Sequence, residues 1–414
     1  AERPVKVLVD LYIKFHDEAE KNAELEDEGR NWFKKLEDGD PEARNLWNQC
    51  IEWSWKEFSA IYEQLGVTFT ENDGRGYGES FFEDKMKEVL VELEQKLGPQ
   101  GQYKESKGAK LVFFPNDKYP PLMILKQDGS TLYSTRDLAT DKFRLSKKEY
   151  GPDVLIINEV GIEQSLYFNQ LYETEKMLGW VQDGQRLHIK HGLYRFKDMK
   201  MSTRKGNVIW LEDVLEEAIK RASQLSKQNI EIEGQEVIST SNKQSLSAKK
   251  HIMPAGQQIN NWPIIGIGAI KSNDLKRNSH LDIVFDWDEI LNMDGNSGPY
   301  IQYTYVRCKS VLEKATLGEL SLSQSHLAEE EMSLIRLLVK FPEVVHDAAA
   351  NFAPNQLCTY LFEVAQLYNL FYQKYPILKA TQAEQQNRIL ITQATARVLQ
   401  NGLRLLGIET VERM

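Results

Sequence analysis

Four positively charged side chains fall within nine residues near the middle of the chain. They are Lys197, Lys200, Arg204 and Lys205, and Ser202 and Thr203 lie between them. Lysine and arginine can neutralise the charge that spreads over a polyphosphate during phosphoryl transfer, and hydroxyl groups can donate hydrogen bonds to it. The heptamer from Lys200 to Gly206 therefore fits a loop that closes over a triphosphate. The same composition also fits an ordinary solvated basic loop.

The segments on both sides of this basic heptamer have the pattern of regular elements. Residues 187–193 alternate apolar and polar side chains, which is typical of a strand. Residues 208–211 are apolar, and Glu212 and Asp213 then suit the first turn of a helix. We expect a strand, a cationic loop and a helix at the edge of an α/β sheet.

Asp137 and Gln164 are candidates for binding a small polar ligand. A carboxylate such as Asp137 can accept two parallel N–H groups from a guanidinium. Spacing alone also fits an acid in the first turn of a helix, stabilised by the helix dipole, and Gln164 also fits an amide at a helix start. His188 and His191 would face opposite sides of a strand, which argues against a shared metal ion.

These candidates fall where strands are predicted to end. A strand is predicted at 153–160, where residues 154–157 are continuously apolar as a buried parallel strand should be, and 164–178 has helical spacing. Strands are also predicted at 110–115 and 122–126. Alternation of strands with helices predicts a parallel sheet, whose ligands bind beyond the carboxyl ends of its strands. Asp137, Glu163, Gln164 and the basic heptamer would all lie at such ends.

The rest of the chain divides by pattern. We predict helices in 5–65, a short strand at 66–70, a Gly-rich surface loop at 73–80, a helix at 81–97, a polar insert at 222–262 and a separate helical bundle from 299 to 414. At the start of the bundle, Tyr300, Tyr303 and Arg307 could contact RNA by stacking and charge. Core packing is the alternative reading of these two aromatic residues.

Composition limits the classes of protein that fit. The chain has 41% apolar and 27% charged residues and no run long enough to span a membrane, as in a soluble protein. Its three cysteines are far apart, which suits a reducing cytoplasm. The net charge of −10 comes from residues 1–100, which hold 13 Lys and Arg against 24 Asp and Glu. Overall acidity therefore does not exclude a nucleic-acid partner.

The basic heptamer closely resembles the second signature of class I aminoacyl-tRNA synthetases, the lysine-methionine-serine loop. Together with the helix at 211–218, it is similar to that of bacterial arginyl-tRNA synthetases. Three further stretches resemble this family in order and spacing. They are the Tyr-Ser-Thr-Arg-Asp sequence at 133–137, the aromatic stretch 298–307 and the chain end 405–414.

The resemblance implies arginine attack on the ATP α-phosphate, pyrophosphate release and esterification of the terminal ribose of tRNA(Arg). It implies that Lys200 and Lys205 stabilise pyrophosphate, that Arg204 or Lys205 supplies the second cation, and that Ser202 positions the loop. It assigns Tyr133, Asp137 and Gln164 to arginine, His191, Met201 and Gly206 to ATP, and Tyr300, Tyr303, Arg307 and Met414 to tRNA. We expect ATP to arrive with Mg²⁺, no protein metal site, no tightly bound cofactor, no membrane partner and a monomer.

The implied fold is an incomplete Rossmann-type parallel sheet with a helical insertion, followed by an all-α anticodon-binding bundle. We expect a catalytic domain at 1–220 with the insertion at about 5–110, a connecting region at 221–298 and the bundle at 299–414. The first class I signature, His-x-Gly-His, is absent from the sequence. We therefore expect this chain to be the C-terminal part of such an enzyme, and inactive or feeble alone. The alternatives are a non-catalytic tRNA-binding relative and a class I synthetase for another amino acid.

Overall fold

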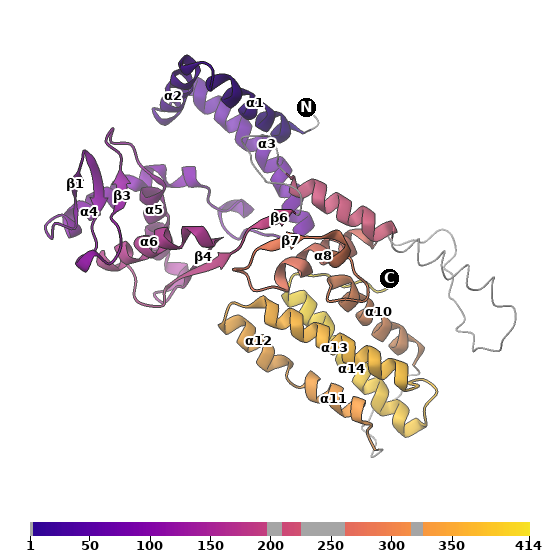
Figure 1. The fold of residues 1–414 in the computed structure, drawn as a ribbon. Coiled ribbons are helices and arrows are strands. Elements are labelled where there is room, and N and C mark those ends of the chain that lie inside the picture. The colour runs from indigo at the N-terminus through magenta and orange to yellow at the C-terminus, as the bar shows by residue number, and fades with distance from the viewer. Residues whose placement is uncertain (1–2, 197–208, 225–260, 316–325) are drawn as a thin grey trace. The chain divides into compact units, whose positions relative to one another are not determined.

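The computed structural model describes residues 3–196, 209–224, 261–315 and 326–414. They form two compact units (Figure 1). Unit 1 combines 1–67, 195–278 and 284–414, and unit 2 combines 68–194 and 279–283. The basic heptamer and residues 225–260 of the polar insert lie outside the described residues.

The first part of unit 1 is helical, as predicted. Helices α1 (Pro4–Ala19), α2 (Ala23–Glu37) and α3 (Pro41–Leu65) follow one another. Prolines begin α1 and α3, and the Asp40 carboxylate accepts hydrogen bonds from the first amides of α3. Gly66, with a φ of 64°, ends α3 in the left-handed conformation. The predicted strand at 66–70 is wrong, because 67–70 leave that turn without pairing to another segment.

Unit 2 opens with irregular and helical segments followed by a small sheet. Two 3₁₀ segments, η1 (Asn72–Gly74) and η2 (Glu79–Lys85), precede helix α4 (Met86–Leu97). Strands β1 (Tyr103–Ser106), β2 (Ala109–Val112) and β3 (Leu122–Leu125) pair antiparallel in that order, and η3 (Pro115–Asp117) lies between the last two. Residues 103–112, within the predicted helical insertion, are thus largely strand.

The prediction that the strands near 110–115 and 122–126 belong to a parallel sheet is wrong. Lys107 and Gly108 have φ angles of 51° and 82°, so they form a tight two-residue turn that reverses the chain between β1 and β2. Asp137 therefore follows an antiparallel strand. It lies on α5 (Tyr133–Ser146), which η4 (Lys148–Tyr150) follows.

The predicted parallel pairing exists later in unit 2. Strands β4 (Ile156–Gly161) and β5 (Arg186–His191) are parallel, and η5 (Ile162–Gln164) and helix α6 (Ser165–Met177) connect them. Their register pairs Ile156 with Arg186 and Gly161 with His191. Leu93 and Leu97 of α4, Ile124 of β3, Leu138 of α5 and Leu171 of α6 are fully buried in one core.

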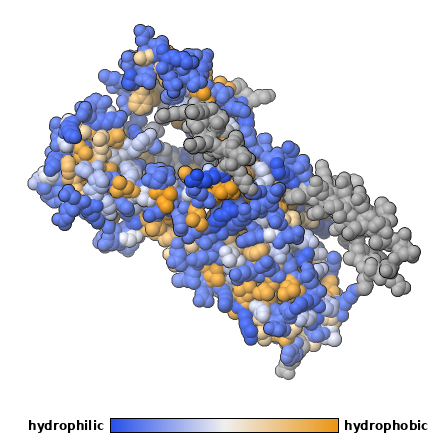
Figure 2. All heavy atoms as spheres, in the orientation of Figure 1, coloured by the Kyte–Doolittle hydropathy of each residue, from blue (hydrophilic) through white to orange (hydrophobic). Residues whose placement is uncertain are grey.

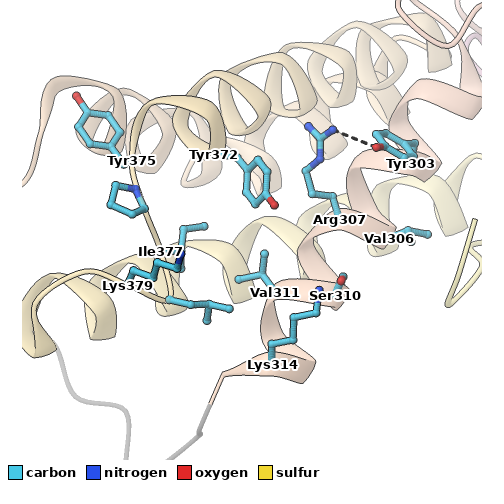
Figure 3. Close-up of a pocket in the computed structure, with 12 residues that line it drawn as sticks. Tyr303, Val306, Arg307, Ser310, Val311, Lys314, Tyr372, Tyr375, Ile377 and Lys379 are labelled. Carbon is cyan, nitrogen blue, oxygen red and sulfur yellow. Dashed lines mark hydrogen bonds between the residues drawn. The ribbon is translucent and has the colours of Figure 1, made fainter. Parts of the chain in front are cut away.

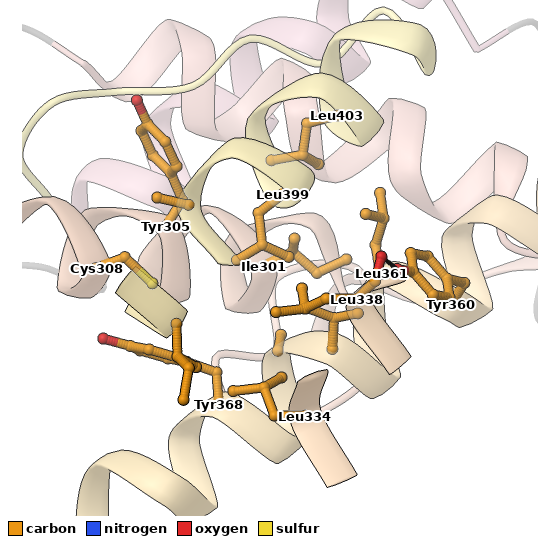
Figure 4. Close-up of a cluster of buried hydrophobic side chains, with 14 of the residues drawn as sticks. Ile301, Tyr305, Cys308, Leu334, Leu338, Tyr360, Leu361, Tyr368, Leu399 and Leu403 are labelled. Atoms are coloured by element: carbon orange, nitrogen blue, oxygen red, sulfur yellow. Dashed lines mark hydrogen bonds between the residues drawn. The ribbon is translucent and has the colours of Figure 1, made fainter. Parts of the chain in front are cut away.

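The remainder of unit 1 is almost entirely helical, and the prediction of a helical bundle after residue 298 is confirmed. A helix occupies 211–224, followed by α8 (Trp262–Leu275) and α9 (Trp287–Ile290), and two short strands, β6 (Tyr194–Phe196) and β7 (Ile283–Phe285), pair with each other. The bundle consists of α10 (Gly298–Lys314), α11 (Glu329–Leu338), α12 (Phe341–Ala350), α13 (Pro354–Lys374) and α14 (Gln382–Leu405). Figure 4 shows its core, in which Tyr305, Tyr368 and Leu399 are buried among aliphatic side chains.

The surface is mainly polar. On the face drawn in Figure 2, hydrophobic residues are scattered among hydrophilic ones. Among the residues that the structure describes, no helix is both long enough and apolar enough to cross a bilayer.

Candidate functional site

The start of α5 is fixed to the neighbouring strand by hydroxyl groups. Ser134 Oγ donates to the Met123 carbonyl, and Thr135 Oγ1 donates to the Ile124 carbonyl at 2.5 Å. Both hydroxyl residues are buried, whereas Tyr133 at the helix start is 68% exposed. The first turn of α5 is therefore held rigidly on β3 while its aromatic ring remains free to contact a ligand.

Asp137 lies one turn beyond Tyr133 and is half-buried. The Tyr167 hydroxyl of α6 donates a hydrogen bond to its Oδ2. Burial raises the pKa of the Asp137 carboxyl above its ordinary value, and the Tyr167 hydrogen bond opposes that rise. An anionic oxygen in such a setting can bind a cation that replaces its lost hydration.

A buried ion cluster lies behind Asp137. Asp141, one turn further along α5, and Glu175 of α6 both contact the guanidinium of Arg186 from β5, with Arg186 Nε 2.8 Å from Glu175 Oε2. The three side chains are at most 2% exposed. The Arg186 guanidinium also lies 4.4 Å from the centre of the Tyr172 ring. Carboxylates and one aromatic face thus already hold a guanidinium within the protein.

Of the two acids in this cluster, Glu175 is the one whose negative charge is less well neutralised by nearby cations. Burial raises the pKa of its carboxyl to about 9, with Asp141 adding to the effect and Arg186 opposing it. Asp141 has a second cation, because Arg144 Nη1 lies 3.0 Å from its Oδ1. We infer that Glu175 carries the proton of the cluster near neutral pH.

Gln164, Glu163 and His191 lie just beyond the carboxyl ends of the parallel pair. Gly161 ends β4 directly opposite His191 of β5, and Gln164 is the residue that precedes α6. Gln164 and Glu163 are exposed. The His191 Nε2 lies 3.8 Å from Glu159 Oε1, and its Nδ1 lies 2.9 Å from the Gly192 carbonyl. Because Tyr167 is one turn beyond Gln164, the start of α6 lies beside Asp137.

A second site occupies the bundle. Arg307 of α10 lies between two aromatic rings, 4.8 Å from the centre of Tyr303 and 5.0 Å from that of Tyr372. Figure 3 shows this arrangement at a pocket of about 500 Å³, to which Lys314 and Lys379 add positive charge. Tyr303 and Tyr372 are partly exposed. Stacked aromatic and guanidinium surfaces of this kind bind nucleic-acid bases.

The other bundle residues singled out from the sequence have different positions. Tyr300 lies behind the pocket, where its hydroxyl accepts from Asn369 Nδ2 at 3.0 Å, and Asn369 Oδ1 accepts from Arg307 Nη1. Met414 is 36% exposed and does not line the pocket. Tyr372 is an aromatic lining residue that sequence reasoning missed. Its only signal was a place two residues before the end of an apolar helix, where it was indistinguishable from core residues.

Several predicted residues lie outside the described part of the chain. They are Lys200, Met201, Ser202, Arg204, Lys205 and Gly206. Within the described ranges there is no group of three or more histidine, cysteine, aspartate or glutamate side chains that could hold a metal ion.

The titration of Glu175 gives a prediction for stability. Its pKa is about 9 in the folded protein against an ordinary value of 4.5, so the folded state binds an extra proton between these values, and stability falls as pH rises through that window. We expect Glu175→Gln to abolish this dependence, which amounts to at most about 1.4 kcal/mol per pH unit. Urea unfolding from about pH 6 to about pH 8.5 measures it.

Glu173→Gln is the matched control for this experiment. Glu173 lies on the same helix and pairs with Lys118 at 2.7 Å on the outside of the unit. The control should keep the wild-type slope of unfolding free energy against pH. Parallel slopes for wild type and Glu175→Gln would contradict the assignment of the proton to Glu175.

Comparison with known proteins divides the chain into two family domains. Residues 1–287 match the family described as tRNA synthetases class I (R), catalytic domain, and residues 301–414 match the DALR anticodon binding domain. The predicted fold class, a partial Rossmann-type catalytic domain followed by a helical anticodon-binding domain, is thereby confirmed.

Individual curated relatives align with nearly the whole length of this chain. The arginine–tRNA ligase of Clostridium perfringens is 40% identical over 418 residues, covering 100% of this chain and 68% of that protein. That of Halothermothrix orenii is 36% identical over 416 residues, covering 99% and 67%. The solved arginyl-tRNA synthetase of Thermus thermophilus shares the fold with a TM-score of 0.73 at 22% identity, covering 97% of this chain and 69% of that one.

A similar fold match extends to the Plasmodium falciparum enzyme, with a TM-score of 0.73 at 23% identity over 95% of this chain and 62% of that one. The chain therefore spans about two thirds of the length of its relatives. The class I catalytic match, the DALR match and the identity to curated relatives lead to one conclusion: this chain belongs to the arginyl-tRNA synthetase family.

Proposed function

We propose that this chain binds L-arginine, ATP and tRNA(Arg) and contributes to arginine activation and its transfer to the tRNA. The observation that carries the proposal is Asp137, a half-buried carboxylate. One of its oxygens has no hydrogen-bond partner in the described part of the chain, and an exposed tyrosine lies one turn away. A guanidinium matches both features, because it can hydrogen-bond the oxygen and pack against the ring. The internal Arg186 is held by the same two kinds of group.

The proposed reaction follows the family. The arginine carboxylate attacks the ATP α-phosphate, pyrophosphate leaves, and the terminal ribose of tRNA then takes the arginyl group. Asp137, Tyr133 and Gln164 select the amino acid. Lys200 and Lys205, with Arg204, neutralise the developing pyrophosphate charge, Ser202 positions the loop, and His191, Met201 and Gly206 contact ATP. Mg²⁺ is proposed to arrive with the ATP phosphates.

The proposed organisation keeps the boundaries expected from the sequence. The catalytic domain is 1–220 with its insertion at about 5–110, the connecting region is 221–298, and the anticodon-binding domain is 299–414. The bundle pocket, together with Tyr300 behind it and Met414 at the chain end, is proposed to contact tRNA. A bacterial type of enzyme, a monomeric state and a cytoplasmic location belong to the same proposal.

The first test is direct binding of L-arginine. Asp137→Asn keeps the side-chain size but removes the charge, so we expect the affinity for L-arginine to fall about 100-fold. Isothermal titration calorimetry with L-arginine and its neutral isostere L-citrulline measures the effect. Asp128→Asn is the control, because Asp128 is exposed in a turn where it accepts from Ser130.

Two results would count against arginine selection by Asp137. One is equal affinity of the wild-type chain for L-citrulline and L-arginine. The other is an unchanged arginine affinity in Asp137→Asn. Binding of a different amino acid in place of arginine would favour a class I synthetase of another specificity.

The second test separates an enzyme from a non-catalytic tRNA-binding relative. Because the sequence has no His-x-Gly-His motif, we expect slow arginine-dependent ATP–pyrophosphate exchange even with tRNA present. Lys200→Ala should lower the residual rate about 100-fold through loss of charge stabilisation, with tRNA affinity nearly unchanged. Robust exchange would refute the expected weakness, and a rate indifferent to Lys200→Ala would support the binding-only relative.

The third test concerns the bundle pocket. Arg307→Lys keeps the charge but loses the planar group that fits between Tyr303 and Tyr372, so we expect affinity for tRNA(Arg) to fall about 10-fold. Fluorescence anisotropy with labelled tRNA measures it. Arg404→Lys, at an exposed position near the end of α14, is the matched control and should change affinity little. Equal losses in both variants would argue against base stacking at Arg307.

A further inference from the structure

Tyr167 is a partly buried donor at the candidate arginine site that the proposed function does not use. Its hydroxyl donates to Asp137 Oδ2, and no other hydrogen bond of that hydroxyl occurs among the described residues. Its ring packs edge-on against Phe168 at 5.2 Å between centres and lies against the core of unit 2. A donor on a ring held in this way has a fixed position relative to the carboxylate.

The hydrogen bond constrains the orientation of Asp137. An aspartate carboxyl group can rotate about its last side-chain bond, and a bidentate guanidinium contact requires one plane of that group. With Oδ2 held by Tyr167, Oδ1 is left without a hydrogen-bond partner among the described residues. Oδ1 can therefore accept one N–H of a guanidinium, and the remaining lone pair of Oδ2 can accept the other.

The same contact favours the anionic form of Asp137. Groups of three elements face this carboxylate: Asp141 and Arg144 from α5, Glu79 from η2, and Tyr167 and Glu175 from α6. Burial and the neighbouring acids favour the neutral form, and the Tyr167 hydrogen bond favours the charged one. Burial together with the negative charge of Asp137 raises the pKa of Tyr167 far above its ordinary value, so Tyr167 remains a donor.

We infer that Tyr167 is a positioning residue for arginine selection, which holds the Asp137 carboxylate in the orientation and the charge state that a guanidinium needs. The inference rests on the proposed function. It assigns no catalytic step to Tyr167, whose hydroxyl acts through Asp137. A purely structural link between α5 and α6 would affect thermal stability without changing the dependence of arginine binding on pH.

The test is calorimetric titration of the Tyr167→Phe variant of the full 414-residue chain with L-arginine. We expect the dissociation constant for L-arginine to rise about 10-fold, because a hydrogen bond to a charged group is lost. The pKa of Asp137 should rise further without its donor. Arginine affinity should then begin to fall at a higher pH than in the wild type as the solution is acidified.

Tyr172→Phe is the matched control. It removes the same hydroxyl from the same helix, where Tyr172 donates to Asn158 Oδ1 at 3.0 Å, and it keeps the ring beside Arg186. This control should bind L-arginine with the wild-type affinity and pH dependence. Circular dichroism melting of both variants shows whether each is folded.

The outcomes distinguish this inference from the proposed function. If the wild type binds L-arginine and Tyr167→Phe binds it with the same affinity and pH profile, the positioning role is wrong. The proposed function is then unaffected. An equal loss in Tyr172→Phe and Tyr167→Phe also overturns it, because the effect would then be general loosening of α6. Absence of arginine binding to the wild type rejects arginine recognition by this chain, and the positioning role with it.

Discussion

The burial of the Arg186 guanidinium is the constraint on which the geometry of unit 2 depends. Arg186 comes from β5, and its partners Asp141 and Glu175 come from α5 and α6, so three elements must meet at one point. Removing a charge from water is costly unless partners are placed accurately, and loss of Asp141 would leave the Arg186 charge uncompensated in the core. This requirement fixes the spacing of the two helices. The exposed end of α5, with Tyr133 and Asp137, is positioned as a consequence.

Two arginine side chains in this chain, Arg186 and Arg307, are held in similar surroundings. Arg186 lies beside Tyr172 with carboxylates at its edge, and Arg307 lies between Tyr303 and Tyr372 with the Asn369 oxygen at its edge. In both cases an aromatic face contacts the plane of the group and oxygen acceptors lie at its rim. Arg186 is enclosed and serves the fold, whereas Arg307 borders an open pocket. The difference in exposure separates a structural guanidinium from the one that we propose contacts RNA.

Rigid support is the shared property of both candidate sites. Ser134 and Thr135 bind α5 to β3, so Asp137 does not depend on a loop for its position. Asn369 connects Arg307 with Tyr300 and Thr304 in the bundle. Ligand-contacting groups on regular elements lose little conformational entropy on binding. The polar residues just behind each site therefore hold the proposed ligand-facing groups in place.

The sequence by itself determined the family resemblance, the helical bundle after residue 298 and the parallel β4–β5 pair, because signature spacing and hydrophobic periodicity are local properties. It also selected Asp137, Tyr303 and Arg307. It could not reveal that the strands before Asp137 pair antiparallel, because strand direction depends on which strands meet in the sheet. Only the tertiary structure brought Tyr167 to Asp137, Arg186 to Glu175 and Tyr372 to Arg307, across separations of 30, 11 and 65 residues. Such contacts depend on how helices and strands pack, and no pattern along the chain encodes which distant side chain completes a site.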